Sequence, residues 1–568
     1  MTVVTPPAVE KIPLVIGVTG HRNLHPEEME LLQDQVRQLL RFLQQRYPDT
    51  PLLLLSPLAE GADRLVAKVA LAEKIRLIVP LPLPVAEYQR DFDTPALRQE
   101  FTELLEQAED VFELPQLSAD ISQKKSEARN LQYVLVGAYV ARHSHILIAL
   151  WDGKTDSDSA HAWGSTYQVI QFRLSGDMTG LPEAYKPSLN PLDLIDTGKV
   201  CHFKVSRSND PSRALDAGEL TLLSPSAAIE RGKLKNLLAQ LPSPELDKIN
   251  EFNQAVAQPG AQPFNKPILP PIIRARLSKS FQTLITLYEQ ASWLSIAHHR
   301  PTERLIRGMF GLGIGMVLAI GLYGQGNDAD SRWFLLLYCL LFAAGYGLFG
   351  VIQHRQLEVK YLHYRALAEA LRVQIFWQLS GLTESVADFY LRKHRSELEW
   401  IRSSLRALCT YNWVNDQLSL ELVQAHWLSN QQQYFQERVI ENRRRLTWSK
   451  TAARSCFMLG LLLTVGLLLI DLGQLNLSPW LHNGWIILMM LFPAIGAAID
   501  GYAEKVGYDA HLKRYTEMAM IYQRAQVALS QQSTAAGKQR VLLEIGKAAL
   551  EENSDWVLLH RERPLKKL

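Results

Sequence analysis

Four apolar runs without charged residues dominate the second half of the chain. They cover Gly308–Gly324, Trp333–Ile352, Ser455–Ile470 and Gly484–Ile499. A helix needs about 20 apolar residues to cross a bilayer core, and about 17 to 25 are tolerated. Buried helices of a soluble core are the alternative, but they rarely stay uncharged over such lengths. The pattern therefore predicts four transmembrane helices, at about residues 308–324, 333–352, 453–470 and 484–500.

The links between these runs are short and contain almost no arginine or lysine. Gln325–Arg332 joins the first two runs and Asp471–Asn483 joins the last two, so each pair is predicted to form a helical hairpin. Arginines and lysines gather on all four outer flanks, whereas the links hold Arg332 alone of these residue types. Because positive loops stay in the cytoplasm, both termini are predicted to be cytoplasmic.

Long amphipathic stretches follow each hairpin, at about Gln356–Thr447 and Ala503–Glu552. They are rich in leucine, alanine, glutamate, glutamine and arginine, a composition that predicts cytoplasmic helices. The order helix, hairpin, helix then occurs twice, without recognisable sequence identity between the copies. We expect one unit over residues 274–400 and a second over 401–568, which ends in a cytoplasmic helix.

The first half of the chain alternates strand and helix patterns. Short apolar runs lie at Pro13–Val18, Pro51–Leu55, Arg76–Val79, His145–Leu150 and Val200–Val205, with amphipathic stretches between them. Continuous apolar strands separated by helices indicate a parallel sheet covered on both faces. The fold class is therefore an α/β Rossmann-like domain, over residues 1–240, followed by an all-α membrane region. A proline-rich linker is expected over 241–273, and a rigid helix over Arg274–His299 would connect it to the first span.

Composition excludes several other classes of protein. The net charge of +2 implies no general attraction to nucleic acid. The four cysteines, Cys201, Cys339, Cys409 and Cys456, show neither a CxxC pair nor the spacing of a metal site, so we expect reduced packing residues and no metal. The first 13 residues lack the apolar core of a signal peptide, so the first domain is expected to stay where it is made.

Candidate binding residues follow the first predicted strand in the sequence GVTGHR. Gly17 and Gly20 allow a tight turn there, and the backbone amides around Thr19 can surround an anion. Arg22 could form an ion pair with a phosphate. Ligands of parallel sheets bind beyond the carboxyl ends of the strands, where this loop is expected to lie.

Two further loops are expected at the same edge. After the second strand, Ser56 begins a loop, and Glu60, Gly61, Ala62 and Asp63 surround the start of the next helix. A helix N-terminus favours anions, although Asp63 could equally be a plain helix cap. After the fourth strand come Trp151, Asp152 and Gly153, and then Gly164, Ser165 and Thr166 open another helix. Three glycine-containing loops at one sheet edge predict a ligand site.

These motifs resemble a known superfamily. GVTGHR, SPLAEGADR and HILIALWDG with a following G-S-T turn are similar to the SLOG superfamily, over about residues 12–240. The resemblance implies a Rossmann-like domain that binds a nucleotide or an NAD-derived signalling ligand, without a resident cofactor. Tyr364–Trp377 (YRALAEALRVQIFW) resembles SLATT domains, two-helix membrane modules of bacterial conflict systems. That second resemblance implies a pore-forming effector in the bacterial inner (plasma) membrane, with a role such as anti-phage defence.

One departure from the SLOG pattern concerns catalysis. Enzymatic members carry P-G-G-x-G-T-x-x-E, whose glutamate serves phosphoribohydrolase chemistry. Here the sequence is A-W-G-S-T-Y-Q-V, so Val169 stands at the position of the acid. A general acid or base is missing at that position. Glu127 and Arg129 could reach the site, or could belong to a surface helix.

The resulting hypothesis is a sensor of a nucleotide-derived ligand coupled to a pore-forming or membrane-disrupting effector. Four spans are too few for a wide pore, so a homo-oligomer is expected, and uncharged spans favour a leak over a selective channel. One alternative is a membrane-anchored enzyme acting on a nucleotide or an NAD-derived substrate, with Glu60 or Asp63 as the acid. Another is a ligand-gated ion channel with a housekeeping role.

Overall fold

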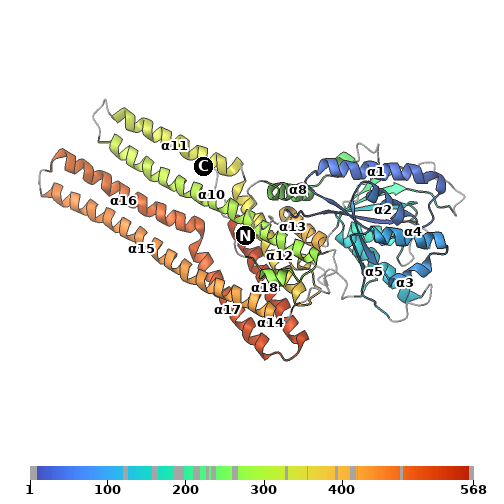
Figure 1. Ribbon diagram of the computed structural model, residues 1–568. Helices are drawn as coiled ribbons and strands as arrows, with labels where there is room; N and C mark the ends of the chain where they lie inside the picture. Colours follow the sequence, from blue (N-terminus) through green and yellow to red (C-terminus); the bar gives the residue numbers. More distant parts are fainter. Residues whose placement is uncertain are drawn as a thin grey trace, which may run out of the picture.

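The computed structural model has an α/β domain at one end and a pair of long helical hairpins at the other (Figure 1). It describes residues 9–118, 126–155, 164–178, 180–182, 197–208, 218–225, 229–231, 238–258, 267–325, 331–354, 356–390, 395–409, 418, 420–473 and 477–561. Between the two ends lies a compact group of shorter helices (Figure 1).

The α/β domain is built on a mostly parallel sheet with the strand order β4-β3-β2-β1-β5-β6-β7-β8. The parallel strands are β1 (Leu14–Gly20), β2 (Leu52–Leu55), β3 (Arg76–Leu81), β4 (Asp110–Glu113), β5 (Ile146–Trp151) and β6 (Lys199–Lys204). The prediction of a Rossmann-like sheet is confirmed. The sequence pattern missed β4 and the antiparallel strands β7 (Leu220–Leu223) and β8 (Ile229–Arg231). β4 lies at the sheet edge and carries charged residues at both ends, so it lacks the continuous apolar run of a central strand.

Helices cover both faces of this sheet, as strand alternation requires. Leu14 and Ile16 of β1 belong to the core formed with α1 (Met29–Arg46), α2 (Ala62–Ala72) and α4 (Pro95–Glu106). Val15 points to the other face and packs in the core with α5 (Glu127–His143) and α6 (Thr166–Ser175). Strand order reverses beside β1, because β2 lies on one side of it and β5 on the other. Such a reversal opens a crevice beyond the carboxyl ends of the strands.

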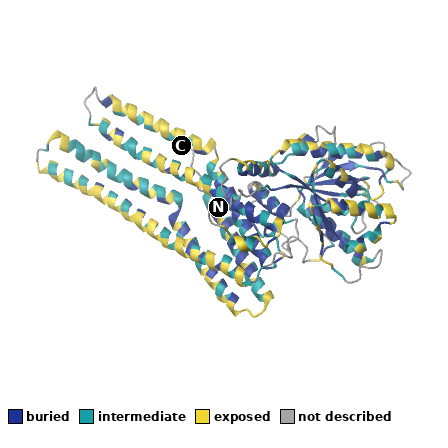
Figure 2. Cartoon of the chain, in the orientation of Figure 1, coloured by how far each residue is buried: buried dark blue, intermediate teal, exposed yellow. Residues whose placement is uncertain are grey.

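Four helices are long and apolar enough to cross a membrane: α10 (Lys279–Tyr323), α11 (Ser331–His354), α15 (Asn430–Leu472) and α16 (Pro479–Val506). α10 packs against α11 and α15 against α16, which gives the two expected hairpins. Most side chains of their apolar segments are exposed or half-buried (Figure 2). The chain is therefore a membrane protein, with an apolar surface that suits lipid. Residues 326–330 and 474–476, in the two predicted links, lie outside the described residues.

The helices that follow each hairpin pack back along its first helix. α12 (Leu357–Leu379) packs along α10, and α17 (Tyr508–Gln531) packs along α15. α18 (Ala535–Arg561) contacts both α12 and α17. We call α12, α13 (Arg395–Leu408), α17 and α18 the helical base. The expected unit boundary at residue 400 falls inside α13, because both units contribute to one packed group of helices.

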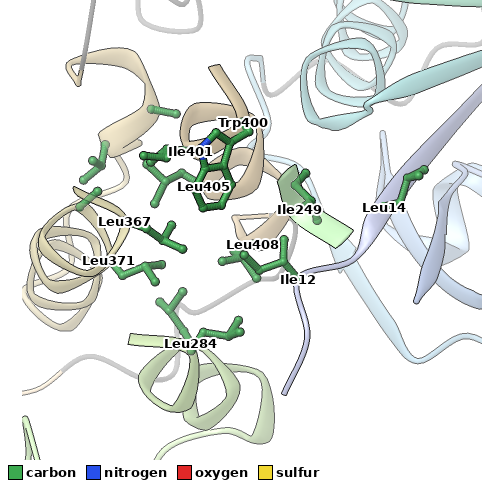
Figure 3. Packing of buried hydrophobic residues seen from close by; sticks show 14 of the residues in the cluster. Ile12, Leu14, Ile249, Leu284, Leu367, Leu371, Trp400, Ile401, Leu405 and Leu408 are labelled. Atoms are coloured by element: carbon green, nitrogen blue, oxygen red, sulfur yellow. The ribbon is translucent and has the colours of Figure 1, made fainter. Parts of the chain in front are cut away.

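The segment expected to be a linker contains packed helix instead. Within 241–273, α8 (Pro244–Val256) and the short α9 (Pro271–Arg274) form, while residues 259–266 lie outside the described part of the chain. Ile249 of α8 is buried in the core that contains Ile12, Leu284 of α10 and Trp400 of α13 (Figure 3). Apolar residues at helical spacing, Leu246, Ile249, Phe252 and Val256, give α8 this buried face. The α/β domain and the helical base thus share one hydrophobic core.

Candidate functional site

A pocket of about 410 Å³ opens at the carboxyl edge of the sheet. Residues from the loops after β1, β2 and β3 line it, together with α5 and the start of α6. These lining residues are Val18, Thr19, Gly20, Arg22, Pro57, Ala59, Asp63, Tyr88, Asp91, Arg129, Asn130, Tyr133, Val136, Gly137, Val140, Gly164, Thr166 and Val169. The pocket therefore lies where the reversal of strand order predicts a ligand crevice.

The loop after β1 brings a cation to the pocket. Gly20 lies so close to the start of α2 that a Cβ atom there would meet the Ala62 Cβ at 2.3 Å. The carbonyl oxygen of His21 accepts a hydrogen bond from the Ala62 amide at 3.1 Å, which fixes the loop against the helix. Arg22 is exposed, and its guanidinium lies 5.6 Å from the centre of the Tyr133 ring. Arg22 forms no ion pair with a carboxylate of the described residues, so its charge can serve a ligand.

The loop after β2 needs a glycine at one position. Gly61 has a φ of +84°, and a Cβ atom there would lie 2.2 Å from the carbonyl oxygen of Arg22. Ser56 stabilises the same loop from within, because its buried hydroxyl accepts a hydrogen bond from the Leu58 amide at 3.2 Å. Ser56 and Gly61 thus shape the loop, and neither lines the pocket.

Asp63, in the first turn of α2, does line the pocket. Its side chain accepts a hydrogen bond from the Ala59 amide at 3.2 Å through Oδ2, so it also caps the loop. Only 4% of the residue is exposed. Burial raises the pKa of Asp63 to about 7, against the opposing effects of the Ala59 amide, Arg22 and Arg64. The interpretation of Asp63 as a helix cap is wrong, because α2 begins after Gly61 without a side-chain cap, and Asp63 holds the preceding loop and lines the pocket.

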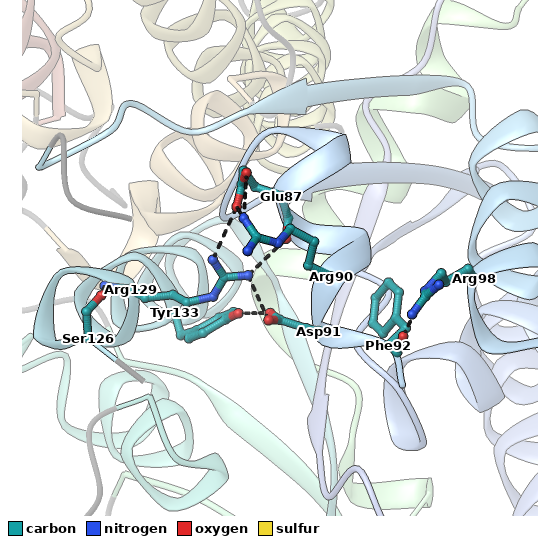
Figure 4. Close-up of polar contacts among 8 residues, drawn as sticks. All are labelled: Glu87, Arg90, Asp91, Phe92, Arg98, Ser126, Arg129 and Tyr133. Atoms are coloured by element: carbon teal, nitrogen blue, oxygen red, sulfur yellow. Dashed lines mark hydrogen bonds and ion pairs between the residues drawn. The ribbon is translucent and has the colours of Figure 1, made fainter. Parts of the chain in front are cut away.

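One wall of the pocket is a polar network around Asp91 (Figure 4). Arg129, of which 2% is exposed, donates hydrogen bonds to Asp91 Oδ1 at 2.7 Å and to the carbonyl oxygen of Glu87 at 2.9 Å. The Tyr133 hydroxyl donates to the other oxygen of Asp91. Burial and this hydrogen bond raise the pKa of Tyr133 to about 12. The network attaches α5 to α3 (Val85–Tyr88) and to the 3-10 turn η2 (Gln89–Asp91).

Several of these wall residues were missed by the sequence analysis. Tyr88, Asp91 and Tyr133 follow no recognisable motif, and they reach the pocket because the loop after β3 lies beside α5. The interpretation of Arg129 as a surface-helix residue is wrong, because its guanidinium is buried against Asp91. Glu127 does not line the pocket.

The floor of the pocket is apolar. Val18, Val136, Val140 and Val169 contribute aliphatic side chains, and Gly137 leaves room for Val169. A Cβ atom at Gly137 would lie 2.6 Å from Val169 Cγ2, so α5 and α6 approach closely here. Val169, where the SLOG resemblance would place an acid, carries an aliphatic side chain into the lining. Gly164, with a φ of +77°, and Thr166 line the pocket beside it, while Ser165 caps α6 by accepting from the Gln168 amide at 3.2 Å.

The remaining predicted residues lie elsewhere. Gly17 packs inside the sheet, where a Cβ atom would meet the Ser144 hydroxyl at 2.1 Å. The Asp152 amide donates a hydrogen bond to His21 Nε2 at 3.1 Å, and the Asp152 carboxylate forms an ion pair with Arg207 Nε at 2.9 Å. Burial opposes ionisation, but His21, the Lys154 amide and Arg207 hold the pKa of Asp152 below its ordinary value. The pocket lining also lacks Glu60, Ala62, Trp151 and Gly153. The predicted residues that do line the pocket together are Thr19, Gly20, Arg22, Asp63, Gly164 and Thr166.

The ionisable groups of the lining are carboxyl, tyrosine and arginine side chains. Neither histidine nor cysteine occurs among those described, and the carboxylates are Asp63 and Asp91. Over the described ranges, no group of three His, Cys, Asp or Glu side chains could hold a metal ion. No protein-family model matches this chain, and no curated protein matches it.

The far end of α5 touches the helical base. Arg142 forms an ion pair with Asp388, in the 3-10 turn η4 (Val386–Asp388) that follows α12. The Tyr139 hydroxyl donates to the carbonyl oxygen of Cys409, just after α13, at 3.4 Å. α5 thus lines the pocket from Arg129 to Val140, and near its C-terminal end it also contacts the helices connected to the membrane.

Proposed function

We propose that the α/β domain senses a nucleotide-type small molecule and that binding changes the state of the membrane helices. The volume of the pocket is in the range of about 300–1,000 Å³ that small-molecule sites occupy. Its apolar floor suits a base or another planar group, and Arg22 at the rim suits a phosphate. The start of α6 adds backbone amides that favour an anion.

The observation that carries the coupling is the position of α5. Arg129 and Tyr133 line the pocket near its start, and Arg142 contacts Asp388 near its end. A helix packed on both sides moves as a unit, because close-packed interiors transmit displacement. A ligand that binds one position of α5 more tightly would therefore shift the balance between two arrangements of the base.

Several copies are needed to form a pore. The main contacts among the spanning helices join α11 to α10, α10 to α16, and α16 to α15. These contacts arrange the helices in a row, and a row encloses no channel. We infer a homo-oligomer whose ligand-bound form permeabilises the membrane, with both termini in the cytoplasm. The resemblance to SLATT modules supports a bacterial inner membrane and a defence role such as anti-phage activity.

A sensor is favoured over an enzyme at the same site. Val169 replaces the acid of the enzymatic pattern, and Asp91 is engaged by Arg129 and Tyr133. Asp63 remains as the carboxyl group not paired with a cation, and one of its oxygens already holds the Ala59 amide. Turnover of a nucleotide by the purified protein would reverse this preference.

A binding screen tests the proposal. The purified full-length protein is titrated with AMP, ADP, ADP-ribose and NAD⁺, with thermal unfolding as the first readout and calorimetry as the second. We expect at least one compound to bind, and Arg22→Ala to weaken that binding by about 10- to 150-fold through loss of about 1.5–3 kcal/mol. Arg37→Ala, on an outer face of α1, is the matched control and should bind as the parent does. Equal affinity in Arg22→Ala would place the ligand elsewhere.

A further inference from the structure

Asp63 is a buried carboxyl group that faces an open pocket. Oδ2 accepts the Ala59 amide, whereas Oδ1 receives no hydrogen bond from the part of the chain that the structure describes. Its position in the pocket lining, together with Arg22, places it where a bound anion would lie. The loop before α2 uses one oxygen of the carboxyl group, and the other oxygen is available to a ligand.

The two arginines near Asp63 differ in whether a carboxylate already pairs with them. Arg64, next to it on α2, is directed away and binds Glu100 at 2.8 Å and the carbonyl oxygen of Leu97 at 2.7 Å. Tyr88 from α3 and Arg22 from the loop after β1 are the other titratable or charged groups that face it. Burial keeps the pKa of Tyr88 far above its ordinary value, so this side chain stays neutral. Arg22 is thus the one facing cation without a carboxylate partner among the described residues.

We propose that Asp63 takes up a proton when an anionic group of the ligand binds at Arg22, and that the protonated carboxyl then donates a hydrogen bond to this group. This inference rests on the proposed function of the pocket. An anion at Arg22 would compete for the cation and would place two negative charges side by side in a buried site, which favours the protonated form. A protonated carboxyl gains an O–H donor, whereas a carboxylate can only accept.

The other pocket carboxylate behaves differently. Asp91 forms an ion pair with the Arg129 guanidinium through one oxygen and accepts the Tyr133 hydroxyl with the other. Both of its oxygens are therefore already occupied by donors of the protein. Burial already raises the pKa of Asp63 to about 7, so protonation near neutral pH costs little free energy. The two carboxylates of one pocket thus have separate roles.

The proposal fixes the sign of a pH dependence. A group whose pKa is higher in the complex than in the free protein favours binding at low pH, and this advantage is lost as pH rises between the two values. Binding should therefore take up close to one proton at pH 8 and almost none at pH 5.5. Affinity should fall by up to about tenfold per pH unit above 7. A phosphate monoester ionises near pH 6, so the charge of the probe changes little above pH 7, where the affinity is expected to fall.

Calorimetry in two buffers of different ionisation enthalpy measures the proton uptake directly. The probe is whichever of AMP, ADP or ADP-ribose binds the full-length protein most tightly at pH 7. For the parent at pH 8 we expect uptake of nearly one proton per probe bound. Asp63→Asn keeps an oxygen for the Ala59 amide and an N–H donor for the anion. It should bind at pH 8 within about threefold of the parent at pH 6, with uptake near zero.

Asp34→Asn, at an exposed carboxylate on α1, is the matched control and should behave as the parent does. Parental binding without proton uptake at pH 8 would overturn the inference and leave the pocket intact. Equal uptake by Asp63→Asn would overturn it as well. If Asp63→Asn fails to fold, the proton uptake measured for the parent at pH 8 still tests the inference. Failure of AMP, ADP, ADP-ribose and NAD⁺ all to bind, in protein with normal thermal unfolding, would overturn the proposed function and this inference together.

Discussion

The ion pair between Arg142 and Asp388 joins the α/β domain to the helical base at the end of the helix that lines the pocket. Both side chains are largely buried, and Arg406 lies 3.6 Å from the other oxygen of Asp388. Burial and the nearby charge of Arg142 lower the pKa of Arg406 well below its ordinary value. Asp388 thus holds together two arginines that would otherwise repel each other.

Arg142→Gln should separate ligand binding from membrane action. Asp388 keeps Arg406 as a partner, so we expect a loss of no more than about 2 kcal/mol in the free energy of unfolding. Ligand affinity should stay within about twofold of the parent, because Arg142 does not line the pocket. Ligand-dependent leakage of vesicles should be strongly reduced. Arg37→Gln is the control. Full leakage by Arg142→Gln would show that the ion pair with Asp388 does not couple the pocket to the membrane.

Gly61 should tolerate no side chain. Gly61→Ala would place a Cβ atom 2.2 Å from the carbonyl oxygen of Arg22 and in a backbone region that L residues rarely adopt. We expect a loss of about 1–3 kcal/mol in stability and a clear loss of ligand affinity, because the Arg22 loop must move. Gly153→Ala has a similar φ of +80° but open space, so it should cost about 1 kcal/mol and leave affinity unchanged. Thermal unfolding and calorimetry of the two variants provide the comparison.

The shared core predicts that the α/β domain and the helical base unfold together. Phe252 of α8 is fully buried, and its ring centre lies 5.8 Å from that of Tyr364 in α12. Phe252→Ala should cost about 3–5 kcal/mol and lower the unfolding temperature of both parts in one transition. Leu31→Ala, at an exposed position on α1, should change stability by less than about 1 kcal/mol. Two separate transitions in the parent, with only one displaced by Phe252→Ala, would contradict a common core.

Orientation in the membrane can be tested by labelling single cysteines in a background without the four native ones. Cysteines at Asn327 and Asn476, in the two predicted links, should react with an impermeant reagent added to intact cells. Cysteines at Ser280 and Gln532 should react only after the cells are opened, because the flanks of all four spans carry the positive charge. External labelling at Gln532 would reverse the predicted topology.

The large apolar features of the fold were predictable from sequence. A continuous apolar run is enough to predict a buried strand or a membrane helix. The local sequence pattern therefore predicted β1, β2, β3, β5 and the four spanning helices. The edge strands and α8 did not, because their residues are held by tertiary contacts. Asn253 illustrates this: its side chain accepts the Ile12 amide at 2.8 Å and donates to the Ile12 carbonyl oxygen at 2.9 Å, across most of the domain. No local pattern reports a contact between residues so far apart in the chain.

The candidate site was predictable in part for the same reason. Glycines with positive φ, such as Gly61 and Gly164, mark turns that the sequence shows directly. Asp91 and Tyr133 come from segments without such turns, and they meet through the packing of α5 against the loop after β3. Trp151 and Asp152 end their strand at the expected edge, yet their side chains contact Tyr167, His202 and His21 instead of the pocket. Strand ends fix the edge of the sheet but not the direction of each side chain.

Ligand-dependent leakage of vesicles tests the coupling of pocket and membrane most directly. The full-length protein is reconstituted into phosphatidylethanolamine–phosphatidylglycerol vesicles that contain a trapped dye, and the tightest-binding nucleotide is added. We expect dye release by the parent at ligand concentrations that fill the pocket, and release by Arg22→Ala only at about 10- to 150-fold higher concentrations. Release that is independent of ligand, or equal in the parent and Arg22→Ala, would contradict a membrane effector controlled through this pocket.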